Sequence, residues 1–115
     1  MDALAIGLDI IEIDRVKKLA RRNPRFLSRV FTPAEIAYCR AKKKQWQHFA
    51  VRFAAKEAVW KALNKAGLIS LRDISVSRDR RGKPGVILQG KPARGFMLSL
   101  SHSQRYAMAV ALRAG

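Results

Sequence analysis

The sequence predicts one α+β domain over residues 1–115, in which an N-terminal strand is followed by three helices and then by antiparallel strands. A chain of 115 residues has the length of one ordinary domain, and 49% hydrophobic content is enough for a folded core rather than a disordered basic tail. The apolar residues also change along the chain from a continuous run to helical spacing and then to several short runs. This order predicts the fold class.

The first strand and the first helix follow each other without a linker. Residues Leu4 to Ile13 form a nearly continuous apolar and β-branched run, which predicts a buried strand. From Arg15 the apolar residues follow helical spacing. This helix is expected to end at Asn23, because Pro24 disfavours helical geometry in the residue before it.

Two further helices are predicted before the second half of the chain. Thr32 is the expected N-cap of the first, with proline at the first helical position and a glutamate at the capping-box position, and this helix should reach about Ala41. Lys42 to Lys44 form an exposed loop. The longest helix is expected from Gln45 to Ala66, with Gly67 as its C-cap, and it is apolar on nearly all sides.

Four strands are expected after the helices, and each is a short apolar run bounded by turn residues. They are Ile74–Asp79, Gly85–Gln89, Phe96–Ser101 and Tyr106–Leu112. Arg80 to Pro84 supply the glycine and proline of a hairpin turn between the first two of these strands.

The charge balance predicts an anionic partner. The chain has 24 lysines and arginines against 8 acidic residues, a net charge of +16, which suits nucleic acid, a membrane surface, a phosphorylated ligand or an acidic protein.

The longest apolar run is far shorter than the ~20 residues of a membrane span. A single cysteine excludes an internal disulfide, and the N-terminal run is broken by Asp9 and Glu12, unlike a signal peptide. We therefore expect a cytoplasmic protein with no membrane contact.

Two carboxylates lie in apolar surroundings, where a carboxylate is costly unless a partner or a metal compensates it. Asp9 interrupts the first strand, and Glu57 lies on the long helix with Lys61 one turn later. Taken singly, Asp9 could cap a strand end and Glu57 could form an ordinary i,i+4 pair with Lys61. Together with Arg52 they predict a Mg²⁺ site for a phosphate ester, because Mg²⁺ takes one or two carboxylates and completes its shell with phosphates and water.

Arg52 lies about 140° around the helix from Glu57, so the two would address different ends of a long ligand. His102 follows a serine-rich strand end and is suited to donate hydrogen bonds to a phosphate, although a structural role at the strand end is the alternative.

A serine hydrolase is disfavoured, because the chain has no Gly-x-Ser-x-Gly motif. Zinc is disfavoured because His48, His102 and Cys39 lack ligand spacing. Cys39 is expected to be a buried free thiol.

The helix after Arg15 carries a basic stripe. Seven positive charges and no acid occur in residues 15–29, and Arg15, Lys18 and Arg22 follow i, i+3, i+7 spacing on one side. This pattern predicts a docking surface for an anionic macromolecule. Nucleic acid is the obvious rival, but the zinc-finger, helix-turn-helix and aromatic RNA-binding patterns do not occur, so only non-specific binding is expected from charge.

Several segments together resemble the small 4′-phosphopantetheinyl transferases, of the holo-[acyl-carrier-protein] synthase type. They are Gly7–Glu12, Phe31–Glu35, Arg52–Ala58 with Lys61–Ala62, and Ser99–His102. The resemblance runs almost from end to end. It implies the fold of that family, a homotrimer with active sites shared between subunits, and transfer of 4′-phosphopantetheine from coenzyme A to a serine of an apo acyl carrier protein in fatty acid biosynthesis.

The resemblance also implies roles for single residues. Asp9 and Glu57 match the Mg²⁺ ligands, and Lys61 matches the lysine that contacts phosphate and assists proton transfer. Glu57, Asp9 or a water would be the base. The positions that match coenzyme-binding residues are Arg52, Lys61, Pro84 and His102. Those that match the surface for the acidic carrier protein are Arg15, Arg22 and Arg25, with Phe26 beside them. Asn64–Gly67 depart from the glycine-rich segment usual in the family.

Two other functions remain as alternatives at the level of the sequence. One is a small basic nucleic-acid-binding module in which the carboxylates are structural. The other is a Mg²⁺-dependent phosphohydrolase that uses the same carboxylates with water as the nucleophile.

Overall fold

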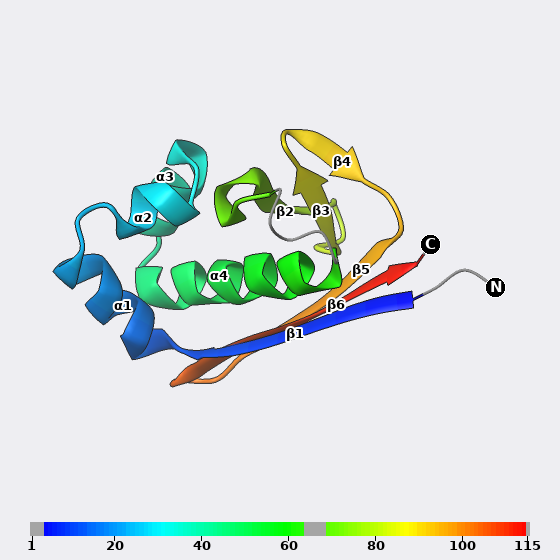
Figure 1. Ribbon diagram of the computed structural model, residues 1–115. Helices are drawn as coiled ribbons and strands as arrows, with labels where there is room; N and C mark the ends of the chain where they lie inside the picture. Colours follow the sequence, from blue (N-terminus) through cyan, green and yellow to red (C-terminus); the bar gives the residue numbers. More distant parts are fainter. Residues whose placement is uncertain (1–3, 64–68, 115) are drawn as a thin grey trace.

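The computed structural model describes residues 4–63 and 69–114. Its helices and strands confirm the predicted α+β class and the order of strand, helices and antiparallel strands (Figure 1). The helical elements are α1 (Ile13–Arg22), α2 (Phe26–Val30), α3 (Pro33–Arg40), α4 (Gln45–Ala62) and the 3₁₀ helix η2 (Leu71–Asp73). The strands are β1 (Leu4–Glu12), β2 (Ile74–Arg78), β3 (Pro84–Leu88), β4 (Lys91–Ala93), β5 (Phe96–His102) and β6 (Tyr106–Ala114). Within these residues, no helix is both long enough and apolar enough to cross a membrane.

The predicted elements are present, and three short ones were missed. Helix α2 makes four α-helices in the described residues where three were predicted; with only five residues it is too short to show a helical period in the sequence. Leu27 and Val30 of α2 are buried. Strand β4 and helix η2 have three residues each and were missed for the same reason. The predicted end of the long helix at Ala66, with Gly67 as its cap, falls outside the described residues.

The strands form two antiparallel sheets, ordered β1-β6-β5 and β2-β3-β4. The first strand of the chain pairs with the last, so that Leu4 lies opposite Ala114. Helix α4 lies along one face of the β1-β6-β5 sheet and also contacts β2 of the other sheet (Figure 1). Asp9 of β1 is paired with Ala109 of β6, which is paired on its other side with Leu100 of β5.

Strand β1 is buried on one face only, which corrects the prediction of a buried strand. Gly7 and Ile11 are buried beneath α4, whereas the alternate residues point to the opposite face. Large apolar side chains on that outer face are exposed to between 38% and 67%: Leu4, Ile6, Leu8, Ile10, Met97, Tyr106 and Met108. The apolar run predicts burial because both faces of the strand are apolar, but the single chain covers only one of them.

Gly7 lets α4 approach the sheet closely. A Cβ atom built on Gly7 would lie 1.8 Å from the carbonyl oxygen of Ala58 on α4. Real Cβ atoms essentially never come closer than 3.0 Å to another heavy atom, so a side chain at this position does not fit the observed packing. Gly7 therefore sets the separation between β1 and α4, the two elements that carry Asp9 and Glu57.

A fully buried lysine joins α4 to the neighbouring elements. The Lys56 ammonium donates hydrogen bonds to Glu35 Oε1 at 2.9 Å, to the Leu71 carbonyl at 3.1 Å and to the Ile74 carbonyl. Burial lowers the pKa of Lys56, and Glu35 opposes that shift. The same Glu35 closes the predicted capping box with Thr32 at the start of α3. Lys56 thus ties α4 to α3, η2 and β2.

Candidate functional site

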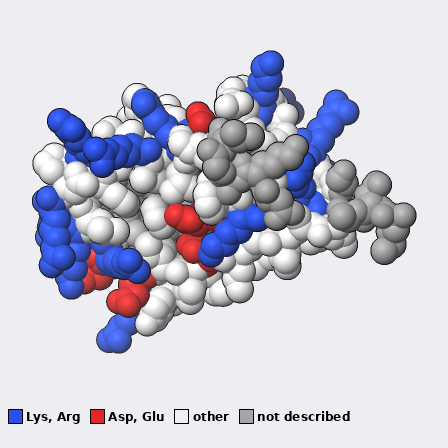
Figure 2. Space-filling model, in the orientation of Figure 1, with Lys and Arg blue, Asp and Glu red and all other residues white. Residues whose placement is uncertain are grey.

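Asp9 and Lys61 meet where β1 passes under the last turns of α4. The Lys61 ammonium donates to the Leu8 carbonyl at 2.8 Å and lies 3.3 Å from Asp9 Oδ1. The Asp9 side chain is only 17% exposed, whereas that of Lys61 is 46% exposed. In Figure 2, acidic side chains lie against a basic one near the middle of this face. The ion pair of Lys61 is therefore with Asp9 of the sheet rather than with Glu57 of its own helix.

Glu57 belongs to the same cluster. Burial is the main cause that raises the pKa of its carboxyl group, and the negative charge of Asp9 raises it further, while Lys61 opposes both. Burial also raises the pKa of Asp9, against the hydrogen bond and the charge of Lys61. The two carboxylates therefore repel one another in a partly desolvated site, and a cation between them would relieve that repulsion.

This donor set suits Mg²⁺ better than it suits zinc. Within residues 4–63 and 69–114 no group of three or more His, Cys, Asp or Glu residues could enclose a metal. Two carboxylates are what Mg²⁺ commonly takes from a protein when phosphate oxygens and water fill its remaining positions. The site consequently fits a metal that arrives with, or is completed by, a phosphorylated ligand.

Arg52 lies apart from the carboxylate cluster of Asp9, Glu57 and Lys61, near the middle of α4. Its guanidinium lies 4.3 Å from the centroid of the Tyr38 ring and donates to the His48 carbonyl at 3.4 Å. Lys42 approaches the same ring, with its Nζ 4.6 Å from the centroid. We call Tyr38, Lys42 and Arg52 the basic cluster. It lies on α3, on α4 and on the loop between them.

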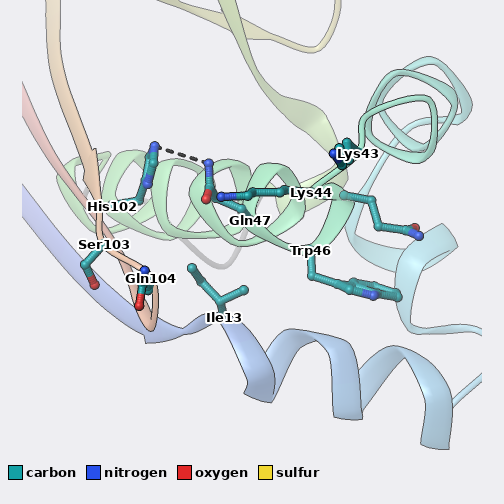
Figure 3. A pocket seen from close by; sticks show the side chains of 9 residues that line it. Ile13, Lys43, Lys44, Trp46, Gln47, His102, Ser103 and Gln104 are labelled. Carbon is teal, nitrogen blue, oxygen red and sulfur yellow. Dashed lines mark hydrogen bonds between the residues drawn. The ribbon is translucent and has the colours of Figure 1, made fainter.

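His102 lies at the end of β5 and faces the first turn of α4. Its Nε2 is 3.3 Å from Nε2 of Gln47, and the two side chains point toward one another (Figure 3). They lie on the wall of a groove of about 630 Å³ at the start of α4, whose other lining residues are Ile13, Lys43, Lys44, Gln45, Trp46, Ser103 and Gln104. Neither Asp9 nor Glu57 lines this groove. The groove and the carboxylate cluster are thus separate features of the chain.

The predicted hairpin turn precedes Pro84, the first residue of β3. Gly82 has a φ of +82°, a conformation that favours glycine, and the Asp79 carboxylate accepts from the backbone N–H groups of Arg81 and Lys83 at 2.8 and 2.9 Å. Arg78, at the end of β2, lines the same narrow cavity as Arg52. The base of the hairpin therefore lies near the basic cluster.

The basic stripe is exposed on α1 and continues into the next turn. Arg15, Arg22 and Arg25 are all exposed, and Figure 2 shows basic side chains gathered at the end of the molecule that α1 occupies in Figure 1. The stripe is partly neutralised, because Lys18 forms an ion pair with Asp14 at 2.9 Å. Phe26 is half-buried, with its ring 6.0 Å from that of Phe53 of α4, so only part of it is available to a partner.

Some residues that shape the site were not found from the sequence. Tyr38, Lys42 and Lys56 had no assigned role, because their partners are set by the packing of α3 against α4 and not by local spacing. The prediction for Cys39 is confirmed: the thiol is buried, and burial raises its pKa. Asn64–Gly67 lie outside the described residues.

The chain matches known proteins over nearly its whole length. A family model described as the 4′-phosphopantetheinyl transferase superfamily matches residues 5–111. The holo-[acyl-carrier-protein] synthase of Moorella thermoacetica is 47% identical over 118 residues, which cover 95% of this chain and 92% of that protein. The corresponding protein of Geotalea daltonii is 43% identical and covers 90% of this chain and 92% of its own length.

Solved structures give the same result. A crystal structure of a holo-(acyl-carrier-protein) synthase from Bacillus anthracis in complex with CoA (3′,5′-ADP) has a TM-score of 0.80 at 33% identity, covering 100% of this chain and 99% of that one. The ACPS–CoA complex of Chronobacterium ammoniagenes has a TM-score of 0.81 at 28% identity and covers 98% of both chains.

Proposed function

The chain belongs to the 4′-phosphopantetheinyl transferase superfamily, and we infer that it transfers 4′-phosphopantetheine from coenzyme A to a serine of an apo acyl carrier protein. The products are the holo carrier protein and adenosine 3′,5′-bisphosphate. The observation that carries this function is the carboxylate cluster of Asp9, Glu57 and Lys61, within a chain that matches holo-[acyl-carrier-protein] synthases almost end to end. The reaction serves fatty acid biosynthesis, and we place it in the cytoplasm.

The two alternatives explain less. In a nucleic-acid-binding module, structural carboxylates would be expected to have full partners. Here burial raises the pKa of both Asp9 and Glu57, and the negative charge of Asp9 raises that of Glu57 further. A phosphohydrolase would use the same two carboxylates, but the relatives over the full chain are carrier-protein synthases. The transferase is therefore favoured over both.

Asp9 and Glu57 would hold Mg²⁺ together with the diphosphate of coenzyme A. The ion would neutralise charge on the diphosphate and draw electron density from the phosphorus that is attacked. Lys61 lies beside Asp9, and its ammonium would stabilise the charge that develops on the leaving phosphate.

In the transfer step, the serine oxygen of the carrier forms a bond to the β-phosphorus of coenzyme A. The bond from that phosphorus to the oxygen bridging the two phosphates breaks, and the bridging oxygen leaves on adenosine 3′,5′-bisphosphate. The serine proton passes to Glu57, to Asp9 or to a water. Desolvation raises the pKa of both carboxyl groups, which makes either carboxylate a stronger base than one in open water.

The other end of coenzyme A would be bound by Arg52 and His102, with Pro84 near the adenine. Arg52 precedes Lys61 by nine residues, about 14 Å along α4, and lies on a different side of the helix. We propose that the two ends of one coenzyme are bound by neighbouring subunits of a homotrimer. The exposed apolar face of the β1-β6-β5 sheet supports this assembly, because an uncovered face of this kind usually marks an interface.

The acidic carrier protein would dock on the exposed arginines Arg15, Arg22 and Arg25. The half-buried Phe26 adds an apolar contact next to them. Exposed charges at the edge of an interface mainly speed the encounter with a partner and orient it. This surface would therefore affect binding of the carrier protein rather than binding of coenzyme A.

The experiment is to incubate the protein with coenzyme A, Mg²⁺ and an apo acyl carrier protein, and to weigh the carrier by mass spectrometry. We expect a gain of one phosphopantetheine group, which Asp9→Ala and Glu57→Ala abolish. Glu12→Gln, an exposed carboxylate on the same strand as Asp9, is the matched control and should retain activity. No adduct with the unaltered protein would exclude the transferase, and full activity of Asp9→Ala would exclude the metal assignment.

A further inference from the structure

The ring of Tyr38 contacts two positive charges from different parts of the chain. Arg52 of α4 and Lys42 of the preceding loop lie 4.3 and 4.6 Å from its centroid. The ring also meets the imidazole of His48 edge-on, with the centroids 6.1 Å apart and the planes at 81°. Tyr38 is 45% exposed, so hydrophobic burial does not account for this arrangement.

The charge of the basic cluster is not balanced by acids. Within residues 4–63 and 69–114 the ion pairs are Lys18–Asp14, Lys56–Glu35 and Lys61–Asp9, and none includes Arg52 or Lys42. The surrounding field is positive, since Arg52 and Lys42 both lower the pKa of His48, after the larger effect of burial. Two cations held on one ring repel each other, and a bound anion would relieve that repulsion.

The chemistry of the cluster suits a phosphate monoester. An arginine offers a planar fork of N–H donors to phosphate oxygens, and a lysine adds a point charge. A phosphate monoester carries about 1.5 to 2 negative charges at neutral pH, enough to neutralise both cations. This inference rests on the proposed function, and coenzyme A has one such group, the 3′-phosphate of its adenosine.

We propose that Tyr38 is a positioning residue that holds Arg52 and Lys42 together as a binding pair for the 3′-phosphate of the coenzyme. The ring contributes no bond to the phosphate. It restricts the two long side chains to one place, so that less conformational freedom is lost when the ligand binds. The carboxylate cluster selects the diphosphate, and the basic cluster selects coenzyme A over the same molecule without the 3′-phosphate.

The test is calorimetric titration of the full chain with coenzyme A and with dephospho-coenzyme A, in the presence of Mg²⁺ and without a carrier protein. The unaltered protein should bind coenzyme A more tightly. Tyr38→Leu should weaken binding of coenzyme A about tenfold and leave that of dephospho-coenzyme A within about twofold. Tyr38→Phe, which keeps the ring, should retain the preference for coenzyme A. Lys91→Ala removes an exposed positive charge on β4. It is the control for the effect of lowering the net positive charge of the protein by one.

The outcomes separate this inference from the proposed function. If Tyr38→Leu keeps the full preference, or weakens both ligands equally, the positioning role is wrong while the transferase stands. A transferase that binds the two ligands equally well would also overturn the inference. If the unaltered protein binds neither ligand, the proposed function and the inference fail together. If Tyr38→Leu folds poorly, the test uses Lys42→Ala, which should reduce the preference for coenzyme A over dephospho-coenzyme A several-fold. A Lys42→Ala variant with the full preference would overturn the proposal that Lys42 and Arg52 bind the 3′-phosphate together.

Discussion

Substitution of Gly7 by alanine tests whether the close contact between β1 and α4 builds the site. The new Cβ would lie 1.8 Å from the Ala58 carbonyl oxygen, so the strand and the helix must separate by about 1.2 Å to reach the 3.0 Å limit of real contacts. A backbone carbonyl cannot rotate away as a side chain would. Overpacking of this kind costs about 1–3 kcal/mol, and we expect a loss of about 3 kcal/mol in the free energy of unfolding.

The same movement should reduce activity beyond the loss of stability. Asp9 follows Gly7 on the same face of β1, so it moves with the strand and away from Lys61, which is now 3.3 Å from its carboxylate. A misplacement of about 1 Å at a catalytic group costs about a hundredfold in rate. We therefore expect kcat of the folded Gly7→Ala variant to fall by about that factor.

Stability is measured by urea denaturation, and activity by mass spectrometry of the carrier at a temperature where the variant is folded. Gly85→Ala is the matched control, because its Cβ would meet only the Ser77 hydroxyl, at 3.0 Å, and that side chain can move. This control should lose little stability and no activity. A Gly7→Ala variant with the unfolding midpoint and the kcat of the unaltered protein would refute the argument.

Three further predictions concern the buried lysine, the carboxylate cluster and the outer face of the sheet. Lys56→Met should lower the free energy of unfolding, measured by urea denaturation, by about 3–5 kcal/mol, because it leaves Glu35 without its cation. The double variant with Glu35→Gln should lose less of this free energy than the two single variants lose in sum. Burial raises the pKa of Glu57, so the folded state binds a proton at this carboxyl group more tightly than the unfolded state does. The free energy of unfolding of the metal-free protein should therefore rise as the pH falls from neutral through that pKa. Glu57→Gln should show a smaller gain when unfolding is followed in EDTA across this range. Ile10→Lys places a charge on the outer face of the sheet and should give a monomer in analytical ultracentrifugation, whereas an unchanged assembly would exclude this face as the interface.

The elements that could be predicted from the sequence are those specified by local patterns. The capping box of Thr32 and Glu35, the turn at Gly82 and the long apolar helix each depend on residues within a few positions of one another, and the structure has all three. Asp9 and Glu57 could be singled out because a carboxylate in an apolar run is costly wherever it folds. Short elements such as α2 were missed, because five residues do not display a period.

The sequence by itself determined the class of fold, the candidate residues of the carboxylate cluster and the basic stripe of α1. Only the tertiary structure decided that Lys61 pairs with Asp9 across 52 positions of the chain, that Lys56 is buried against Glu35, and that Tyr38 gathers two cations. It also decided that one apolar face of β1 is covered by α4 and the other is left open. The physical reason is that a local pattern shows which side chains need partners, whereas the packing of distant elements determines which partner each one meets.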